Sequence, residues 1–177
     1  MNKCTTKQER QRYTSRATLV ALGMKVRQLG TLGLIAERVE IAQKTVKYRP
    51  VDKLVDALIT ILAGARGLVE ANKRVRPDRA LQRAFGRQGC AEQSVISETL
   101  NACTEENVQQ MQQATADIYQ QRSAGYRHNY QQELQLLDVD MTGQPCGKKA
   151  AFASKGYFAK QRNRRGRQLG RVLVTWY

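Results

Sequence analysis

The stretch LLDVDMTGQPCGKK, residues 136–149, places two aspartates at the end of an apolar run, before a glycine-containing turn and a basic segment. Residues 134–141 alternate as a β-strand does, with Asp138 and Asp140 on one face. Apolar side chains occur on both faces, which predicts a central strand covered on both sides. A carboxylate there is costly unless it is paired or binds a metal ion. The aspartates are therefore candidates for a metal site; the alternative is the polar end of a surface strand.

A second strand is predicted over residues 170–177, where Val172, Val174 and Trp176 alternate. The connection between the two strands, residues 147–168, is basic, and we expect it to be mobile. A sheet of two strands is only marginally stable by itself. Because the chain before these strands has helical periodicity, the predicted fold class is α+β, with a mainly helical N-terminal region followed by the start of a sheet.

The charge of the chain is strongly positive and unevenly distributed. The 177 residues include 30 Lys and Arg against 15 Asp and Glu, a net charge of +15, and no acidic residue follows Asp140. The basic residues after Asp140 are Lys148, Lys149, Lys155, Lys160, Arg162, Arg164, Arg165, Arg167 and Arg171. Such a charge favours nucleic acid or an acidic membrane surface as the partner.

Several classes of protein are disfavoured by the composition. The four cysteines form no CxxC pair and there is one histidine, so a structural zinc site is not expected. The first twenty residues lack the apolar segment of a signal peptide. The longest apolar run, residues 54–69, contains two charged residues and is too short to span a bilayer. We therefore expect a cytoplasmic protein with free thiols and without a membrane partner.

The N-terminal region predicts several helices. Residues 5–47 have a weak helical pattern interrupted by glycines, and Pro50 is placed where a helix can begin. In that helix Leu54, Leu58 and Ile61 recur at helical spacing and are expected to face the core, with Val55 and Ile59 widening the buried face. A long polar helix follows Thr104, which is a suitable N-cap. It covers the domain or bridges to the strands, so the predicted domains are residues 1–132 and 133–177.

Two short helices, one after Pro77 and one over about residues 91–102, are separated by glycines and suggest a helix-turn-helix. A plain helical hairpin is the alternative. Under the helix-turn-helix hypothesis, basic side chains contact phosphates and polar side chains of the second helix reach base edges. The predicted phosphate contacts are Arg79, Arg83 and Arg87, and the predicted base-reading residues are Gln93, Ser94 and Ser97.

The segment LLDVDMTG, followed by GKKAAFASKGYFAKQRNRRGRQLGRVLVT at 147–175, resembles the start of the catalytic domain of bacterial insertion-sequence transposases of the DDE type. The segment RALQRAFGRQGCAEQSVISETLNA, residues 79–102, resembles the DNA-binding region of such enzymes. The resemblance implies an RNase H-like fold for the strands, with the first catalytic aspartate ending the first strand. Asp140 matches the family's Asp-x-Thr pattern and is the candidate for that residue and for a Mg²⁺ ligand, with Asp138 as the alternative.

The resemblance also implies a chemistry that this chain does not complete. DDE transposition uses two Mg²⁺ ions about 3.5–4 Å apart, held by three acidic residues, to cleave and join DNA. The second and third acids of the family come much later than the first, and no acidic residue follows Asp140 here. We therefore expect a fragment that binds DNA at element ends and is inactive alone. It is either a remnant of an interrupted gene or a DNA-binding competitor, so the expected partners are DNA and a second copy or a full-length transposase.

Two other hypotheses remain open from the sequence. A stand-alone helix-turn-helix regulator with a basic tail explains the charge but leaves the strand aspartates without a role. A structural RNA-binding protein of ribosomal type uses the basic tail with Tyr157 and Phe158 for stacking. In all three hypotheses the tail contacts nucleic acid, and its predicted contacts are Lys148, Lys149, Lys155, Lys160, Arg162, Arg164, Arg165 and Arg167.

Overall fold

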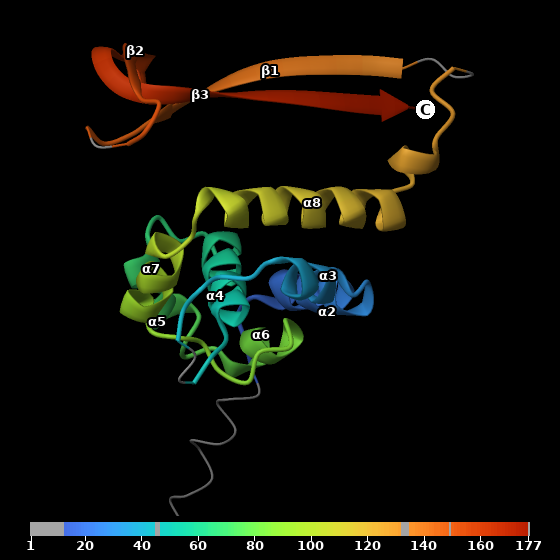
Figure 1. Ribbon diagram of the computed structural model, residues 1–177, viewed down its shortest axis with the longest axis vertical. Helices are drawn as coiled ribbons and strands as arrows, with labels where there is room; N and C mark the ends of the chain where they lie inside the picture. The colour runs from blue at the N-terminus through green and yellow to red at the C-terminus, as the bar shows by residue number, and fades with distance from the viewer. Residues whose placement is uncertain (1–12, 45–46, 132–134, 149, 177) are drawn as a thin grey trace, which may run out of the picture. The chain divides into compact units, whose positions relative to one another are not determined.

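A computed structural model describes residues 13–44, 47–131, 135–148 and 150–176 of the chain, which separates into two compact units between Tyr126 and Arg127. One unit is helical and the other is a three-stranded antiparallel sheet (Figure 1). The predicted α+β class is confirmed at this level. The domain boundary predicted at 132–133 lies outside the described residues.

The helical unit contains seven described α-helices and one 3₁₀ helix. Their bounds are α2 (Ala17–Gln28), α3 (Thr31–Arg38), α4 (Pro50–Leu62), η1 (Leu68–Glu70), α5 (Ala71–Arg74), α6 (Arg79–Ala84), α7 (Gln93–Asn101) and α8 (Glu105–Arg122). A second 3₁₀ helix, η2 (Gly125–Arg127), follows α8. Among the described residues no single helix has the length and apolar character needed to cross a bilayer; α2 and α3 meet that criterion only jointly, across a bend of 62°.

The core of the helical unit forms where α4, α5, α6 and α7 meet. Ile59, Leu81, Ile96 and Val75 are fully buried there. Phe85 packs directly on Gly23 of α2, where a Cβ atom would lie 2.6 Å from its ring. Glycine at that position therefore lets α2 approach the helix that precedes Phe85.

Helix α4 begins at Pro50, as predicted, but buries a different face from the one the leucine spacing indicates. Val55 and Ile59 are buried, at 7% and 0% exposure, whereas Leu58 and Ile61 are 39% and 67% exposed. The buried face also contains Asp56, which has 0% exposure. The prediction that Leu58 and Ile61 face the core is wrong, because the helix is turned so that Asp56 reaches a partner inside the unit.

Helix α8 is capped by Thr104, whose hydroxyl accepts a hydrogen bond from the Asn107 backbone N–H at 3.4 Å. Ala114 on its inner side is buried, and α8 packs along α3 (Figure 1). Asn107 donates to the Glu40 carbonyl at 2.6 Å, which attaches the start of α8 to the segment after α3. The prediction that α8 covers the domain fits these contacts.

The sheet consists of β1 (Gln135–Pro145), β2 (Ser154–Phe158) and β3 (Gln161–Trp176), in the order β1-β3-β2. β1 and β3 are paired from Gln135 with Trp176 to Pro145 with Gly166. Two sequence predictions are corrected. β1 is an edge strand and not a central one, and its apolar side chains are exposed, with Leu137 at 61% and Val139 at 62%.

The second correction concerns the basic connection at 147–168, which we expected to be a mobile loop. Most of it is strand, because β2 and the first half of β3 form an antiparallel hairpin. The two residues between the strands, Ala159 and Lys160, have φ of 49° and 64°. Positive φ at both positions is typical of the two-residue turn that matches strand twist. Neither residue is the glycine or asparagine that identifies this turn in a sequence.

An extra residue in β3 bends the hairpin. Gly156 pairs with Arg164 and Phe158 with Gln161, so β3 has one more residue than β2 between these pairs. Asn163 has a φ of 56°, which asparagine tolerates better than most residues. A bulge of this kind bends and twists a strand, and β3 curves where it pairs with β2 (Figure 1).

Candidate nucleic-acid interface

The most strongly charged element of the sheet is the hairpin formed by β2 and the first half of β3, which we call the basic hairpin (residues 154–167). Its basic side chains are all exposed. They are Lys155, Lys160, Arg162, Arg164, Arg165 and Arg167. Of the predicted tail contacts, Lys148 is also exposed, and Lys149 lies outside the described residues.

The packing of Phe158 orders the basic hairpin. Phe158 is 5% exposed and lies over three glycines, at positions 143, 156 and 166. A Cβ atom at Gly166 would be 2.4 Å from the Phe158 ring, so the ring occupies space that any other residue would fill. An aromatic ring over cross-strand glycines stabilises a sheet that lacks side chains there. One apolar contact therefore holds a hairpin whose other side chains are largely charged.

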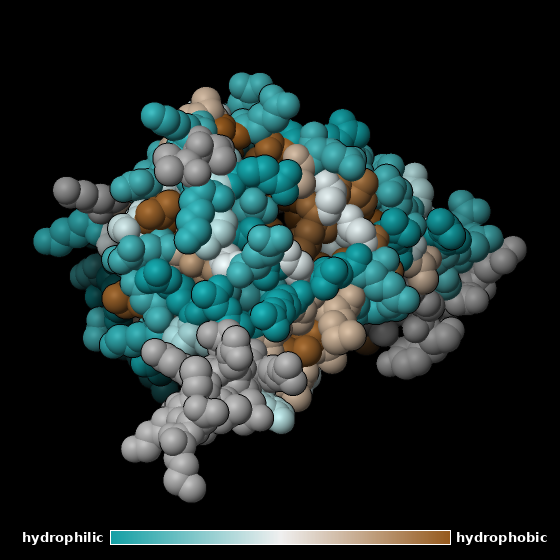
Figure 2. All heavy atoms as spheres, turned by 90° about the horizontal axis from the view of Figure 1, so that it is seen from below, coloured by the Kyte–Doolittle hydropathy of each residue, from teal (hydrophilic) through white to brown (hydrophobic). Residues whose placement is uncertain are grey.

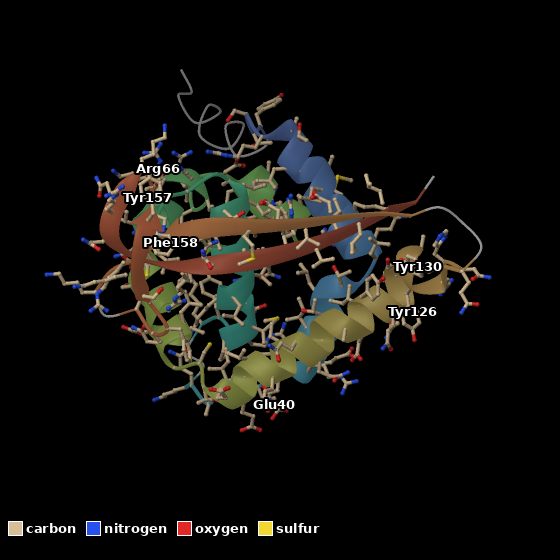
Figure 3. All side chains as sticks on the ribbon, turned by 90° about the horizontal axis from the view of Figure 1, so that it is seen from above. Glu40, Arg66, Tyr126, Tyr130, Tyr157 and Phe158 are labelled. Atoms are coloured by element: carbon tan, nitrogen blue, oxygen red, sulfur yellow. The ribbon has the colours of Figure 1, made fainter. Side chains whose placement is uncertain are left out.

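Alternation along the strands divides the charges of the basic hairpin between two faces. Lys155 is directly opposite Arg165, and Arg167 follows two residues later on the same face. Tyr157 on β2 (Figure 3) is 68% exposed. Arg164 belongs to the opposite face, where its Nη1 donates to Gln161 Oε1 at 3.2 Å. Cations repeat along one face at about 6.7 Å, the two-residue spacing of a strand.

The cations of the basic hairpin are not neutralised by carboxylates. Within the described residues the ion pairs of the sheet involve only Arg171, and none of the six basic residues of the hairpin takes part in one. Exposed guanidinium and ammonium groups without acidic partners are free to contact phosphate oxygens. These exposed cations are distributed over both faces of the hairpin.

The two strand aspartates lie next to this surface on β1. Asp138 and Asp140 share one face with Arg171, which is directly opposite Asp140. Arg171 Nη2 is 3.9 Å from Asp138 Oδ2 and 3.8 Å from Asp140 Oδ2. Thr142 Oγ1 donates to Asp140 Oδ2 at 3.3 Å. Sequence reasoning did not give Arg171 a role beside the aspartates, because only the strand register reveals that placement.

This arrangement does not fit a Mg²⁺ site. Side chains of Asp138 and Asp140 are 55% and 51% exposed, and a guanidinium already compensates both carboxylates. Among the described residues no three His, Cys, Asp or Glu side chains are grouped to hold a metal ion. A hard cation of this size requires about six oxygen ligands, several of them carboxylates. We therefore derive no catalytic step through a metal from these residues.

In the helical unit, the predicted helix pair exists as α6 and α7. They are joined by residues 85–92, a longer connection than the three or four residues usual in a helix-turn-helix. Ser94 is exposed, and Gln93 and Ser97 are partly exposed, so these three side chains of α7 are accessible. Arg83 is exposed as well, and the partly buried Arg79 donates through Nη1 to the Gln88 carbonyl at 3.1 Å.

Arg87 is a different case, because it is buried and fully engaged within the helical unit. It is 8% exposed, and its Nε and Nη2 donate to Asp56 Oδ1 and Oδ2 at 2.8 and 3.1 Å. Its Nη1 lies 3.1 Å from Asp52 Oδ1. The Ala91 backbone N–H also donates to Asp56 Oδ2, at 2.8 Å. All three guanidinium nitrogens of this buried side chain face carboxylates, so we remove Arg87 from the predicted phosphate contacts.

The pKa values of this network reflect burial and pairing. Burial raises the pKa of the Asp56 carboxyl, and hydrogen bonds from Arg87 and Ala91 oppose the rise. Burial lowers the pKa of Arg87, but its hydrogen bonds to Asp56 and the charges of Asp56 and Asp52 together leave that pKa raised. Burial by itself raises the pKa of Asp52, but the hydrogen bond from Arg49 and the charge of Arg87 leave that pKa lowered. The network is an ionic element of the core.

The chain was also compared with known proteins. No family model, no curated protein and no solved structure matches it.

Proposed function

We propose that this chain is a DNA-binding protein of the DDE transposase type and that the basic hairpin makes its main contacts with DNA. The observation that supports this most strongly is the set of six exposed basic side chains on the hairpin, which form no ion pair with any residue that the structure describes. Negative charge is absent from the sequence after Asp140, so nothing there repels a phosphate backbone. Charge of this kind supplies most non-specific affinity for DNA.

The hairpin contacts are expected to be insensitive to base sequence. Lys155, Arg165 and Arg167 point to one face and meet phosphates, and Tyr157 adds an aromatic surface on which an unpaired base stacks. Sequence preference is assigned instead to α7, through Gln93 and Ser94 with Ser97. Amide and hydroxyl groups on an accessible helix face are suited to base edges in a major groove.

In this proposal the chain binds the ends of its element and does not cut DNA alone. The described residues lack a group of three metal-ligating side chains, and Asp140 is paired with Arg171. Incubation of the purified chain with element-end DNA and Mg²⁺ or Mn²⁺ should leave the strands intact. Metal-dependent nicking that is lost in Asp140→Asn would show that Asp140 belongs to a complete active site.

Binding to two duplexes at two salt concentrations tests the proposal. One duplex carries the terminal inverted repeat that flanks the gene, and the other is a scrambled sequence of equal length and composition. We expect tighter binding to the inverted repeat, with the preference retained at higher salt. Substitution of Gln93, Ser94 and Ser97 by Ala should remove the preference and leave the affinity for the scrambled duplex. Equal binding by the original chain would reduce the function to general nucleic-acid binding, and no binding would reject it.

A further inference from the structure

The helical unit contains a hollow of about 710 Å³ lined by residues of α4, α5 and α7, and also by Gln43, Lys44, Lys47 and Tyr48. Figure 1 shows these three helices next to one another. A hollow of this size is within the range of small-molecule sites. The face of the molecule in Figure 2 is mainly hydrophilic, with hydrophobic side chains showing between the polar ones, and polar groups likewise line this hollow.

The lining of the hollow is predominantly cationic. Its basic residues are Lys44, Lys47, Lys53, Arg76 and Arg79, and its acidic residues are Glu92 and Glu98. Five positive and two negative charges give the lining a net charge of +3. Burial raises the pKa of Cys90, which also lines the hollow, to about 12, so its thiol adds no negative charge. A concave surface of one predominant sign concentrates anions.

Lys53 gives the strongest indication that the hollow binds an anion. It is 4% exposed, and its Nζ donates to Gln43 Oε1 at 3.0 Å. That oxygen also accepts from Thr99 Oγ1 at 2.6 Å. An ammonium group has three donors, and in the part of the chain that the structure describes Gln43 is the one acceptor of Lys53, with no carboxylate in ion-pair range. Buried charges are normally paired, as Asp56 is with Arg87.

The other walls of the hollow supply groups that complement Lys53. Arg76 is exposed, and its Nη1 donates to the neutral Asn72 Oδ1 at 3.3 Å, so its charge is not compensated there. Tyr48 provides an aromatic ring, with Lys47 Nζ 5.3 Å from the ring centroid. Two exposed cations and a buried one thus line a space that also has an aromatic side.

We propose that this hollow binds one nucleotide of a DNA strand, with the phosphate held by Lys53, Arg76 and Lys47 and the base against Tyr48. The inference depends on the proposed DNA binding only for the source of the nucleotide. The hollow belongs entirely to the helical unit, so its ligand can be tested separately from the basic hairpin.

Isothermal titration of the full chain with thymidine 5′-monophosphate, thymidine and inorganic phosphate tests the proposal. We expect one site for the monophosphate, at least tenfold weaker binding of inorganic phosphate and no measurable binding of thymidine. The exposed-residue variant Lys47→Gln/Arg76→Gln should weaken monophosphate binding at least tenfold. The control variant Lys25→Gln/Lys73→Gln removes the same charge from exposed positions that do not line the hollow, and it should bind within twofold of the original chain.

Each contrary result overturns a defined part of the proposal. Thymidine binding as tightly as the monophosphate excludes a phosphate site, and equal affinity for inorganic phosphate excludes a nucleotide site. The same loss in both double variants means that diffuse charge alone attracts the ligand. Lys53→Gln, checked for folding by circular dichroism, should also weaken binding at least tenfold; unchanged affinity in the folded variant removes Lys53 from the site.

The test also separates this proposal from the function proposed above. Arg164→Gln/Arg165→Gln should weaken duplex binding and leave monophosphate binding unchanged. A chain that binds the monophosphate and no duplex contradicts the DNA-binding function but supports the pocket. A chain that binds duplex DNA and no monophosphate at millimolar concentration contradicts the pocket alone.

Discussion

Replacing Arg87 by Met should destabilise the helical unit more than any change to an exposed ion pair. Arg87 donates two hydrogen bonds to Asp56 and contacts Asp52, and it is 8% exposed. The substitution leaves Asp56, at 0% exposure, with the Ala91 N–H as its remaining donor. Removing one partner of a buried pair typically costs about 3–5 kcal/mol. For a chain of this length that is a fall of about 6–20 °C in Tm.

Thermal and urea unfolding followed by circular dichroism at 222 nm measure this loss, with Arg38→Met as the matched control. Arg38 pairs with Asp117 at 2.7 Å but is 54% exposed, so its loss should cost at most about 1 kcal/mol. In Asp56→Leu/Arg87→Met neither charge of this pair is left behind without its partner, and much of the stability should return. The Ala91 N–H then lacks an acceptor, which retains a cost of about 1–3 kcal/mol. Equal effects of Arg87→Met and Arg38→Met would refute the buried network.

Three further predictions concern single sites. Gly23→Ala should destabilise the chain by about 1–3 kcal/mol, because the new Cβ meets the Phe85 ring at 2.6 Å. Gly33→Ala, whose Cβ meets no atom within 4 Å, should stabilise the chain by up to about 1 kcal/mol. Urea unfolding compares the two variants, and free-energy changes of the same sign would contradict the packing. The pKa of Asp52 is lowered in the folded chain, so its stabilising contribution is present above pH about 4 and is lost as the pH falls through the folded pKa. In Asp52→Asn the unfolding midpoint should therefore vary less between pH 7 and pH 3, and a pH profile equal to that of the original chain would contradict this. Because Cys90 is buried and its pKa is raised, iodoacetamide at pH 8 should leave its thiol unalkylated in the folded chain. Mass-spectrometric peptide mapping checks this, and alkylation of Cys90 as fast as in urea would contradict its burial.

The sequence predicts features that depend on neighbouring residues. Pro50 marks the start of α4 because its missing N–H is tolerated in a first turn. Alternation over 134–141 predicts the strand that forms β1, Gln135–Pro145. The buried face of α4 could not be predicted in the same way, because it depends on the pairing of Asp56 with Arg87, 31 residues away. The leucine spacing instead predicted that another face of α4, which is largely exposed, would be the buried one.

The basic hairpin was missed for a related reason. Its turn uses Ala159 and Lys160 in left-handed conformations, and neither residue is a turn signal. Dense positive charge in 160–167 is typical of a solvated loop. The contact that organises the strands is Phe158 over Gly156 and over Gly143 and Gly166, which are more distant in sequence. The basic residues themselves could be identified as candidate contacts, because net charge is a property of composition alone. The distribution of these basic residues over opposite faces could not be predicted, because it depends on the pairing register of β2 and β3.

The central claim is that the basic hairpin contacts the DNA backbone, and the salt dependence of duplex affinity tests it most directly. The dissociation constant of the chain for one duplex would be measured from low to physiological salt for the original chain, the hairpin variant Arg165→Gln/Arg167→Gln, and the charge-matched Lys25→Gln/Lys73→Gln. Each phosphate contact contributes about 0.9 to the slope of log K against log salt. We predict a slope smaller by about two in the hairpin variant and unchanged in the control. A hairpin variant with the slope of the original chain would contradict the claim.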